Sequence, residues 1–150
     1  MNVGMVVFGL KDKYMAAPIE YVKEILKLDK ITRLPNAPVI VKGLMNVRGI
    51  LLPVVDGRKL FNVDEDEELT EEQKKQMRIL WVSTGREGEE DIGILVDHIL
   101  GILFVDEEEL KEVPEGMEGD EKFKASLLWN DKFVLMIDID NLLRGRGDGR

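Results

Sequence analysis

Short apolar runs alternate with polar turns along most of the chain. Runs rich in β-branched and aromatic residues, bounded by Gly, Asn, Asp or Lys, are typical of β-strands. Short strands separated by turns at this spacing favour small barrels or a sandwich over a parallel α/β sheet. The pattern predicts strands at residues 5–10, 14–17, 31–34, 77–83, 92–96, 102–105, 126–129 and 133–137, and a strand–turn–strand unit within 43–56.

A few segments carry helical signals instead. After Pro18, which suits a first helical turn, the apolar residues at 19, 22, 25 and 26 fall on one helical face. Asp56 has a side chain that caps helices, and Thr70 with Gln73 forms the pattern of a capping box. The sequence therefore predicts short helices or helical turns at residues 19–26, 38–42, 57–61, after Thr70 and at 139–144.

Residues 62–76 are polar and mostly acidic, and they form the candidate boundary between two halves of the chain. The acidic run 64–68 lacks the central glycine and final glutamate of a calcium-binding EF-hand loop. No sequence repeat is strong enough to prove that the halves are copies. Residues 145–150 are expected to be a flexible tail.

Composition narrows the class of protein. With 150 residues and 44% hydrophobic side chains, the chain is long enough to fold as a domain with its own core. It has no cysteine, which excludes disulfides and thiolate zinc sites, and no apolar run near the ~20 residues that span a bilayer. The net charge of −9 disfavours nucleic acid and anionic membranes as partners. We expect a cytoplasmic protein without direct membrane insertion.

Candidate catalytic chemistry is sparse. His98 is the single histidine, so a metal site or catalytic triad would need other donors. Asp138 and Asp140 alternate and could bind a metal or transfer protons, but a capped helix start is the favoured interpretation. Ser83 and Ser126 lie outside nucleophile-elbow motifs, and phosphate-binding glycine motifs are missing. We expect no cofactor, no metal and no enzyme activity; an enzyme that uses the two aspartates or the acidic loop stays the alternative.

Arg48 is the residue that most suggests binding. It lies in the Asn46–Gly49 turn between two apolar runs, so its charge must reach solvent or a carboxylate such as Glu24. An arginine held on a rigid turn and surrounded by apolar surface is typical of binding hot spots. The alternative is an arginine at a hairpin tip with no role.

Several segments together resemble one known family. The spacing N-x-R-G-x-x-x-P-V, from Asn46 to Val54, is the most specific of them. Departures are Gly57 where the family has Leu, Val47 for the central Leu, and residues 16–18 in place of a β-branched stretch. In order over nearly the whole chain, residues 21–25, 31–38, 42–56, 93–99 and 135–143 resemble the CheW family of chemotaxis coupling proteins.

The resemblance implies a mainly β fold: one domain over residues 1–150 built from two SH3-like five-stranded β-barrel subdomains with a shared hydrophobic core. It implies a non-catalytic adaptor that binds chemoreceptor tips in a groove between the subdomains, and the regulatory domain of the chemotaxis histidine kinase, at membrane-bound receptor arrays. A specialised adaptor or a kinase-regulatory-type domain with another partner is the alternative. The implied receptor contacts are Val6, Ile19, Val22, Glu24, Arg48 and Ile99, and the implied kinase contacts are Ile31 and Leu51, with residues 114–123 as a second contact.

Overall fold

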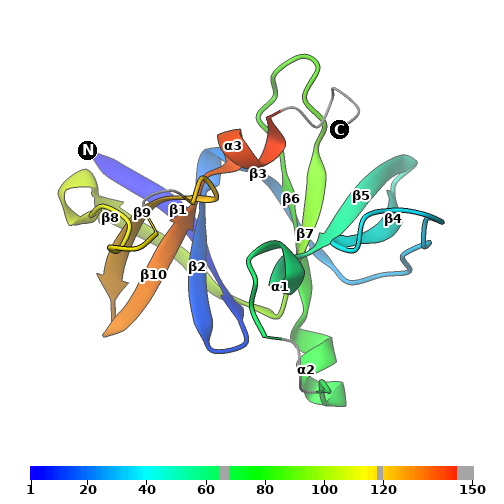
Figure 1. Ribbon diagram of the computed structural model, residues 1–150, viewed down its shortest axis with the longest axis horizontal. Coiled ribbons are helices and arrows are strands. Elements are labelled where there is room, and N and C mark those ends of the chain that lie inside the picture. The colour runs from blue at the N-terminus through cyan, green and yellow to red at the C-terminus, as the bar shows by residue number, and fades with distance from the viewer. Residues whose placement is uncertain (65–67, 118–119, 145–150) are drawn as a thin grey trace.

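The structure, a computed structural model, describes residues 1–64, 68–117 and 120–144. Within these residues ten strands form two five-stranded sheets, which lie side by side in Figure 1. Sheet A contains β1 (Asn2–Leu10), β2 (Lys13–Pro18), β8 (His98–Asp106), β9 (Phe123–Trp129) and β10 (Lys132–Ile137), in the order β8-β1-β2-β10-β9. Sheet B contains β3 (Val22–Lys27), β4 (Val41–Val47), β5 (Ile50–Asp56), β6 (Arg78–Val82) and β7 (Ile92–Val96), in the order β3-β6-β7-β5-β4.

The helical elements of the described residues are all short. The side chain of Asp56 accepts hydrogen bonds from two backbone N–H groups of the first helix, and Thr70 with Gln73 forms the capping box of the second. Asp138 caps the third by accepting from Asn141 N. These caps confirm three sequence predictions. The elements are α1 (Gly57–Leu60), α2 (Glu71–Gln76), α3 (Ile139–Leu143), and the 3-10 turns η1 (Ile19–Tyr21) and η2 (Glu107–Glu109).

The helix predicted at residues 19–26 is wrong. The structure has one 3-10 turn there, and then β3 with alternating half-buried and exposed side chains. Pairing with β6 satisfies the backbone of this segment, and this tertiary contact overrides the helical spacing of its apolar residues. The helical turn predicted at 38–42 is also wrong, because residues 38–40 form a turn and β4 begins at Val41.

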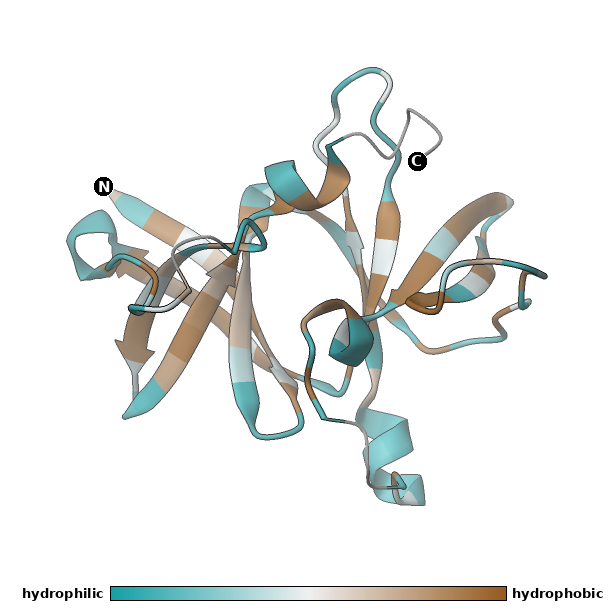
Figure 2. Ribbon diagram, in the orientation of Figure 1, coloured by the Kyte–Doolittle hydropathy of each residue, from teal (hydrophilic) through white to brown (hydrophobic). Residues whose placement is uncertain are grey.

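Three hydrophobic clusters hold the described strands together. One lies within sheet A and one within sheet B, while the largest takes side chains from both sheets, such as Phe8 of β1 and Ile94 of β7. Central strands are therefore covered on both faces, and the strands in Figure 2 are mostly brown. The shared core expected from the sequence is confirmed.

The strand pairings leave both sheets open, so the structure shows a mainly β fold of two five-stranded sheets and does not show closed barrels. In each sheet, one isolated β-bridge lies where the two edge strands approach each other. Thr32, which follows edge strand β3, pairs with Leu44 of the opposite edge strand β4. Lys111, which follows edge strand β8, pairs with Ser126 of the opposite edge strand β9.

The two sheets exchange strands. Among the described residues the chain crosses from sheet A to sheet B through η1, and returns at Asp97 between β7 and β8. Residues 62–76 therefore connect β5 to β6 inside sheet B and do not separate the sheets. They separate two halves of equal topology, β1–β5 with α1 and β6–β10 with α3. The expected tail at 145–150 lies outside the described residues.

Candidate protein-binding surface

Arg48 lies at the tip of the β4–β5 hairpin. The turn has two residues, and both take positive φ, +52° at Arg48 and +90° at Gly49. Such tight hairpin turns require this conformation, which glycine adopts readily and arginine does not. Asn46 Oδ1 accepts a hydrogen bond from Gly49 N (2.8 Å) and holds the turn. The guanidinium therefore projects from a rigid turn, as the sequence predicts.

Glu24 is the carboxylate that Arg48 binds. Two hydrogen bonds join them, from Arg48 Nη1 to Oε2 (3.1 Å) and from Nη2 to Oε1 (2.6 Å). The bonds lower the pKa of the Glu24 carboxyl below its ordinary value. The Arg48 side chain is 66% exposed, so the pair is open to a partner. Because Glu24 lies on β3 and Arg48 follows β4, the pair also connects the two edges of sheet B.

Ile19 and Phe104 are exposed apolar residues that lie near each other, and Ile19 is in the η1 turn that leads into β3. Both side chains lie over Gly4, where a Cβ atom would be 2.7 Å from Phe104 Cε1 and 3.1 Å from Ile19 Cγ2. Ile19 is 37% exposed and Phe104 62% exposed. By the register of β8 on β1, Ile102 lies on the same face of β8 as Phe104 and is also exposed. The small Gly4 thus makes room for an apolar surface at the edge of sheet A.

The sequence pattern predicts a strand at residues 102–105 but does not identify Ile102 or Phe104 as exposed contact residues. Their run of four apolar residues carries no polar position to reveal an exposed face. A signal did exist in Gly4, whose missing side chain is opposite Phe104 in the β1–β8 register. That signal can be read only once the pairing is known.

Val6 does not belong to this surface. It is 1% exposed in the core shared by both sheets, because β1 is an inner strand of sheet A. Its side chain offers no contact to a partner, and we correct this assignment. Val22 and Ile99 are half-buried and pack against the same core.

The remaining residues follow two edge strands of different sheets, β3 and β8. Ile19 and Phe104 both lie next to Gly4, at one end of these strands. At the other end, Ile99 lines a shallow pocket with Arg78, whose partner in the β3–β6 register is Lys27, the last residue of β3. We call the set the edge surface: Ile19, Val22, Glu24, Arg48, Ile99, Ile102 and Phe104.

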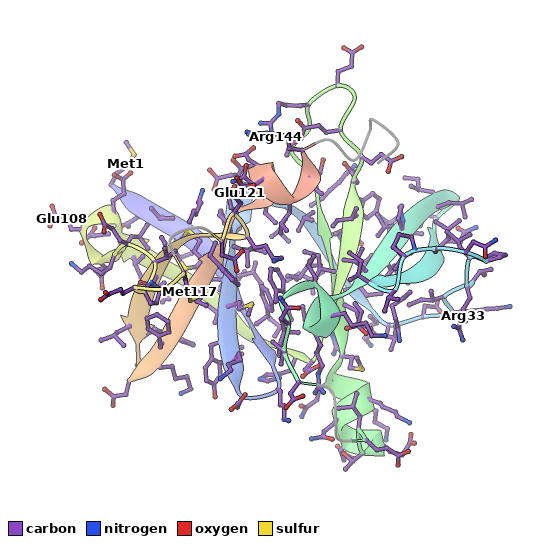
Figure 3. The ribbon with its side chains drawn as sticks, viewed as in Figure 1. Met1, Arg33, Glu108, Met117, Glu121 and Arg144 are labelled. Atoms are coloured by element: carbon purple, nitrogen blue, oxygen red, sulfur yellow. The ribbon has the colours of Figure 1, made fainter. Side chains whose placement is uncertain are left out.

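The residues expected to contact the kinase lie on sheet B. Leu51 is 60% exposed on β5, and its neighbour Ile50 is exposed as well. Ile31 is half-buried against the sheet B core, next to the Thr32–Leu44 bridge. In Figure 3 Arg33, from the same loop as Ile31, lies at the right end of the molecule, whereas Met117, from the second expected contact at 114–123, lies left of its centre. Residues 118–119 of that second contact lie outside the described residues.

The candidate catalytic residues have structural surroundings. The imidazole of His98 packs on Gly9 of β1. Asp138 caps α3, whereas Asp140 accepts a hydrogen bond from the Tyr21 hydroxyl and forms an ion pair with Arg86. No group of three or more His, Cys, Asp or Glu side chains among the described residues could hold a metal ion. No helix in the described part of the chain has the length and apolar character needed to cross a membrane.

Comparison with known proteins identifies relatives along almost the whole chain. Residues 4–146 match the family model of the CheW-like domain. Chemotaxis protein CheW of Bacillus subtilis is 34% identical over 116 residues, covering 77% of this chain and 69% of that protein. CheW of Thermotoga maritima is 24% identical over 136 residues, covering 91% and 84%. The crystal structure of the scaffolding protein TtCheW from Thermoanaerobacter tengcongensis superimposes with a TM-score of 0.79 at 26% identity, covering 93% of this chain and 86% of that one.

Proposed function

The chain belongs to the CheW family, and we propose on that basis that it is a non-catalytic adaptor coupling chemoreceptors to the chemotaxis histidine kinase. The observation that carries the proposal is the family match over residues 4–146, together with the fold shared with a CheW scaffolding protein. The adaptor would work in the cytoplasm, at membrane-bound receptor arrays. The two open sheets would correspond to the family's SH3-like barrels, with the Thr32–Leu44 and Lys111–Ser126 bridges at the places where each sheet closes.

The edge surface is the proposed receptor site. Chemoreceptor tips are helical hairpins, and a helix docks through apolar side chains on surfaces that combine apolar and charged groups. Ile19, Ile102 and Phe104 supply the exposed apolar contact. Glu24 of the Arg48–Glu24 pair lies further along the chain on β3, which follows η1, and the pair would fix the orientation of the docked helix more than its affinity.

The outer face of the β4–β5 hairpin is the proposed kinase site. Leu51 supplies its most exposed large apolar side chain, Ile50 is exposed on the alternate face near the hairpin tip, and Ile31 lies on the neighbouring loop. The partner would be the regulatory domain of the kinase, since an apolar patch of this kind suits a folded domain with a matching patch. Leu51 and Arg48 lie on one hairpin, so a single element would serve both partners.

Arg48→Ala tests the receptor site. We expect the dissociation constant for a receptor fragment containing the hairpin tip to rise about tenfold, because an arginine at a rigid turn is a typical hot spot. Binding to the kinase regulatory domain and the melting temperature should change little. Arg144→Ala is the matched control, because Arg144 is an exposed arginine after α3. A large drop in melting temperature with normal receptor binding would show that Arg48 is structural.

Leu51→Asp tests the kinase site. We expect titration calorimetry to show no binding to the kinase regulatory domain, while circular dichroism shows an unchanged fold, because the side chain is exposed. Leu128→Asp places the same charge at another exposed leucine, on sheet A, and serves as the control. Unfolding by Leu51→Asp alone would mean that Leu51 belongs to the core.

A further inference from the structure

Tyr21 occupies the first crossing between the sheets. It is the last residue of η1, between Ile19 and the β3 residues Val22 and Glu24, all three of which belong to the edge surface. Its carbonyl accepts a hydrogen bond from Ser83 N (2.9 Å), which follows β6 of sheet B. The position of Tyr21 therefore affects how the backbone that carries Ile19, Val22 and Glu24 passes from sheet A to sheet B.

A carboxylate of α3 binds this tyrosine. The Tyr21 hydroxyl donates to Asp140 Oδ2 at 2.6 Å, and Arg86 Nη2 lies 2.7 Å from Asp140 Oδ1. Arg86 belongs to the β6–β7 loop of sheet B and is itself held by two hydrogen bonds to Glu89. In Figure 1, α3 lies at the top of the view, between the strands of the two sheets. Asp140 thus connects the helix that follows sheet A, the crossing segment and a loop of sheet B.

The second crossing has an equivalent contact with different chemistry. Arg58, the second residue of α1 as Asp140 is of α3, binds Asp97 through three hydrogen bonds of 2.6–3.0 Å. Asp97 lies between β7 and β8 and also accepts from Lys11 N in the β1–β2 turn of sheet A. Each crossing is thus held by the second residue of the helix that ends one half. The recurrence at both crossings argues that the contact is a feature of the fold.

We propose that Tyr21 and Asp140 are positioning residues, which touch no partner and hold the η1–β3 segment so that Ile19, Val22 and Glu24 form one surface. The role in receptor binding rests on the proposed function. The proposal concerns the first crossing because the edge surface contains residues on both sides of it. Around Asp97, Ile99 is the nearest member of the edge surface, and the ion pair there is largely buried.

Loss of the Tyr21 hydroxyl removes the bond and keeps the ring, which packs against the shared core. The segment then samples more arrangements, of which a fraction is competent to bind. A receptor that selects the competent arrangement binds with a dissociation constant raised by the inverse of that fraction. The kinase site on the β4–β5 hairpin does not include the crossing, so the affinity for the kinase regulatory domain should not change.

The experiment uses Tyr21→Phe and Asp140→Asn in the full chain, with Tyr14→Phe as control. Tyr14 is the other of the two tyrosines, is also half-buried, and its hydroxyl has no hydrogen-bond partner among the described residues. Amide hydrogen exchange at Val22 and Ser83 should accelerate about tenfold in both test variants, the factor that one net hydrogen bond contributes. Exchange within the β4–β5 hairpin should stay unchanged, and Tyr14→Phe should change neither.

Binding separates this role from general destabilisation. We expect the dissociation constant for the receptor fragment to rise about fivefold in both test variants, with unchanged affinity for the kinase regulatory domain. Equal losses for both partners, or unchanged exchange at Val22 and Ser83, would overturn the proposal. Faster exchange with unchanged receptor binding would overturn the positioning role. If the unaltered chain did not bind the receptor fragment, the proposed function would fail, and the exchange rates alone would decide whether the contact holds the segment.

Discussion

The two halves of the chain share a topology and differ at equivalent surface positions. The β4–β5 and β9–β10 hairpins both close with two-residue turns in which both residues take positive φ, Arg48–Gly49 and Asn130–Asp131. Asn and Asp tolerate the left-handed region through local hydrogen bonding, so the second turn needs no other explanation. Arg48 lacks this tolerance, and the hairpin geometry alone would favour another residue there. An arginine at this position is consistent with the receptor-binding role proposed for Arg48.

The ion pairs at the two crossings also differ, in this case in how far they are buried. The pair Arg58–Asp97 has side-chain exposures of 13% and 12%, whereas Arg86 and Asp140 have exposures of 49% and 29%. A buried pair is hard to replace one partner at a time, while an exposed pair contributes little to global stability. The Arg58–Asp97 pair at the second crossing therefore holds the fold. The Arg86–Asp140 pair at the first crossing is suited to adjusting a local segment.

The strongest test of the shared topology separates the halves. We expect fragments 1–68 and 69–150 each to be unfolded alone and to assemble when mixed, because each sheet contains strands from both halves and the parallel pairs β2–β10 and β5–β7 join them. Trp81, 2% exposed in the intact chain, reports assembly by fluorescence. The intact chain cleaved by protease after residue 68 is the control and should stay assembled. A cooperative unfolding transition of either isolated fragment would contradict the exchange of strands.

The next test compares the crossings by stability. Asp97→Ala removes three hydrogen bonds from the Arg58 side chain and one from Lys11 N in a largely buried site, and the free energy of unfolding should fall by about 3 kcal/mol. Asp140→Ala should lower it far less, because Arg86 keeps Glu89 and is half-exposed. Urea denaturation of both variants, with equal m-values, measures the difference. Equal losses of unfolding free energy in the two variants would show that both crossings contribute equally to stability.

Much of the strand pattern and the hairpin carrying Arg48 follow from the sequence, because alternation, turn residues and caps act locally. Asp56, Thr70 and Asp138 are caps in the structure as their neighbouring residues predict. The segment at 19–26 could not be assigned this way, since its strand depends on pairing with β6, more than fifty residues later. Local patterns are weakest where the partner is distant.

The candidate binding surface shows the same difference between residues that the sequence predicts and residues that only the strand order brings together. Glu24 was named as one possible partner of Arg48, and two hydrogen bonds join the pair in the structure. Val6 was placed at the surface by resemblance, and its burial follows from the inner position of β1, which no local pattern reveals. Two features were not predicted because they bring distant residues together. Phe104 lies about 85 positions after Ile19, and Asp140 lies 119 positions after Tyr21. Only the strand order brings such residues together.

The smallest expected effect is a pH dependence of the first crossing. The hydrogen bond to Asp140, aided by burial, raises the pKa of the Tyr21 hydroxyl from its ordinary 10 to about 12. A pKa raised by folding gives stability that is fully present below the unfolded value and is lost as pH rises through the folded value. The contribution of Tyr21 should therefore be complete below about pH 10 and disappear toward pH 12. Tyr21→Phe should show a flatter stability profile across that window than the unaltered chain.

Absorbance titration of the Tyr14→Phe variant measures this directly, because Tyr21 is then the only tyrosine. We expect ionisation near pH 12, and Asp140→Asn in the same background should lower the pKa toward 10, because a neutral amide holds the phenol less strongly and adds no negative charge. Asp140 behaves in the opposite sense. The same bond, with Arg86, lowers the pKa of its carboxyl, so its contribution is present above the ordinary value and is lost only in acid. Ionisation of Tyr21 near pH 10 in the parent background would mean that Asp140 does not hold it in solution, and the crossing would then be fixed by packing alone.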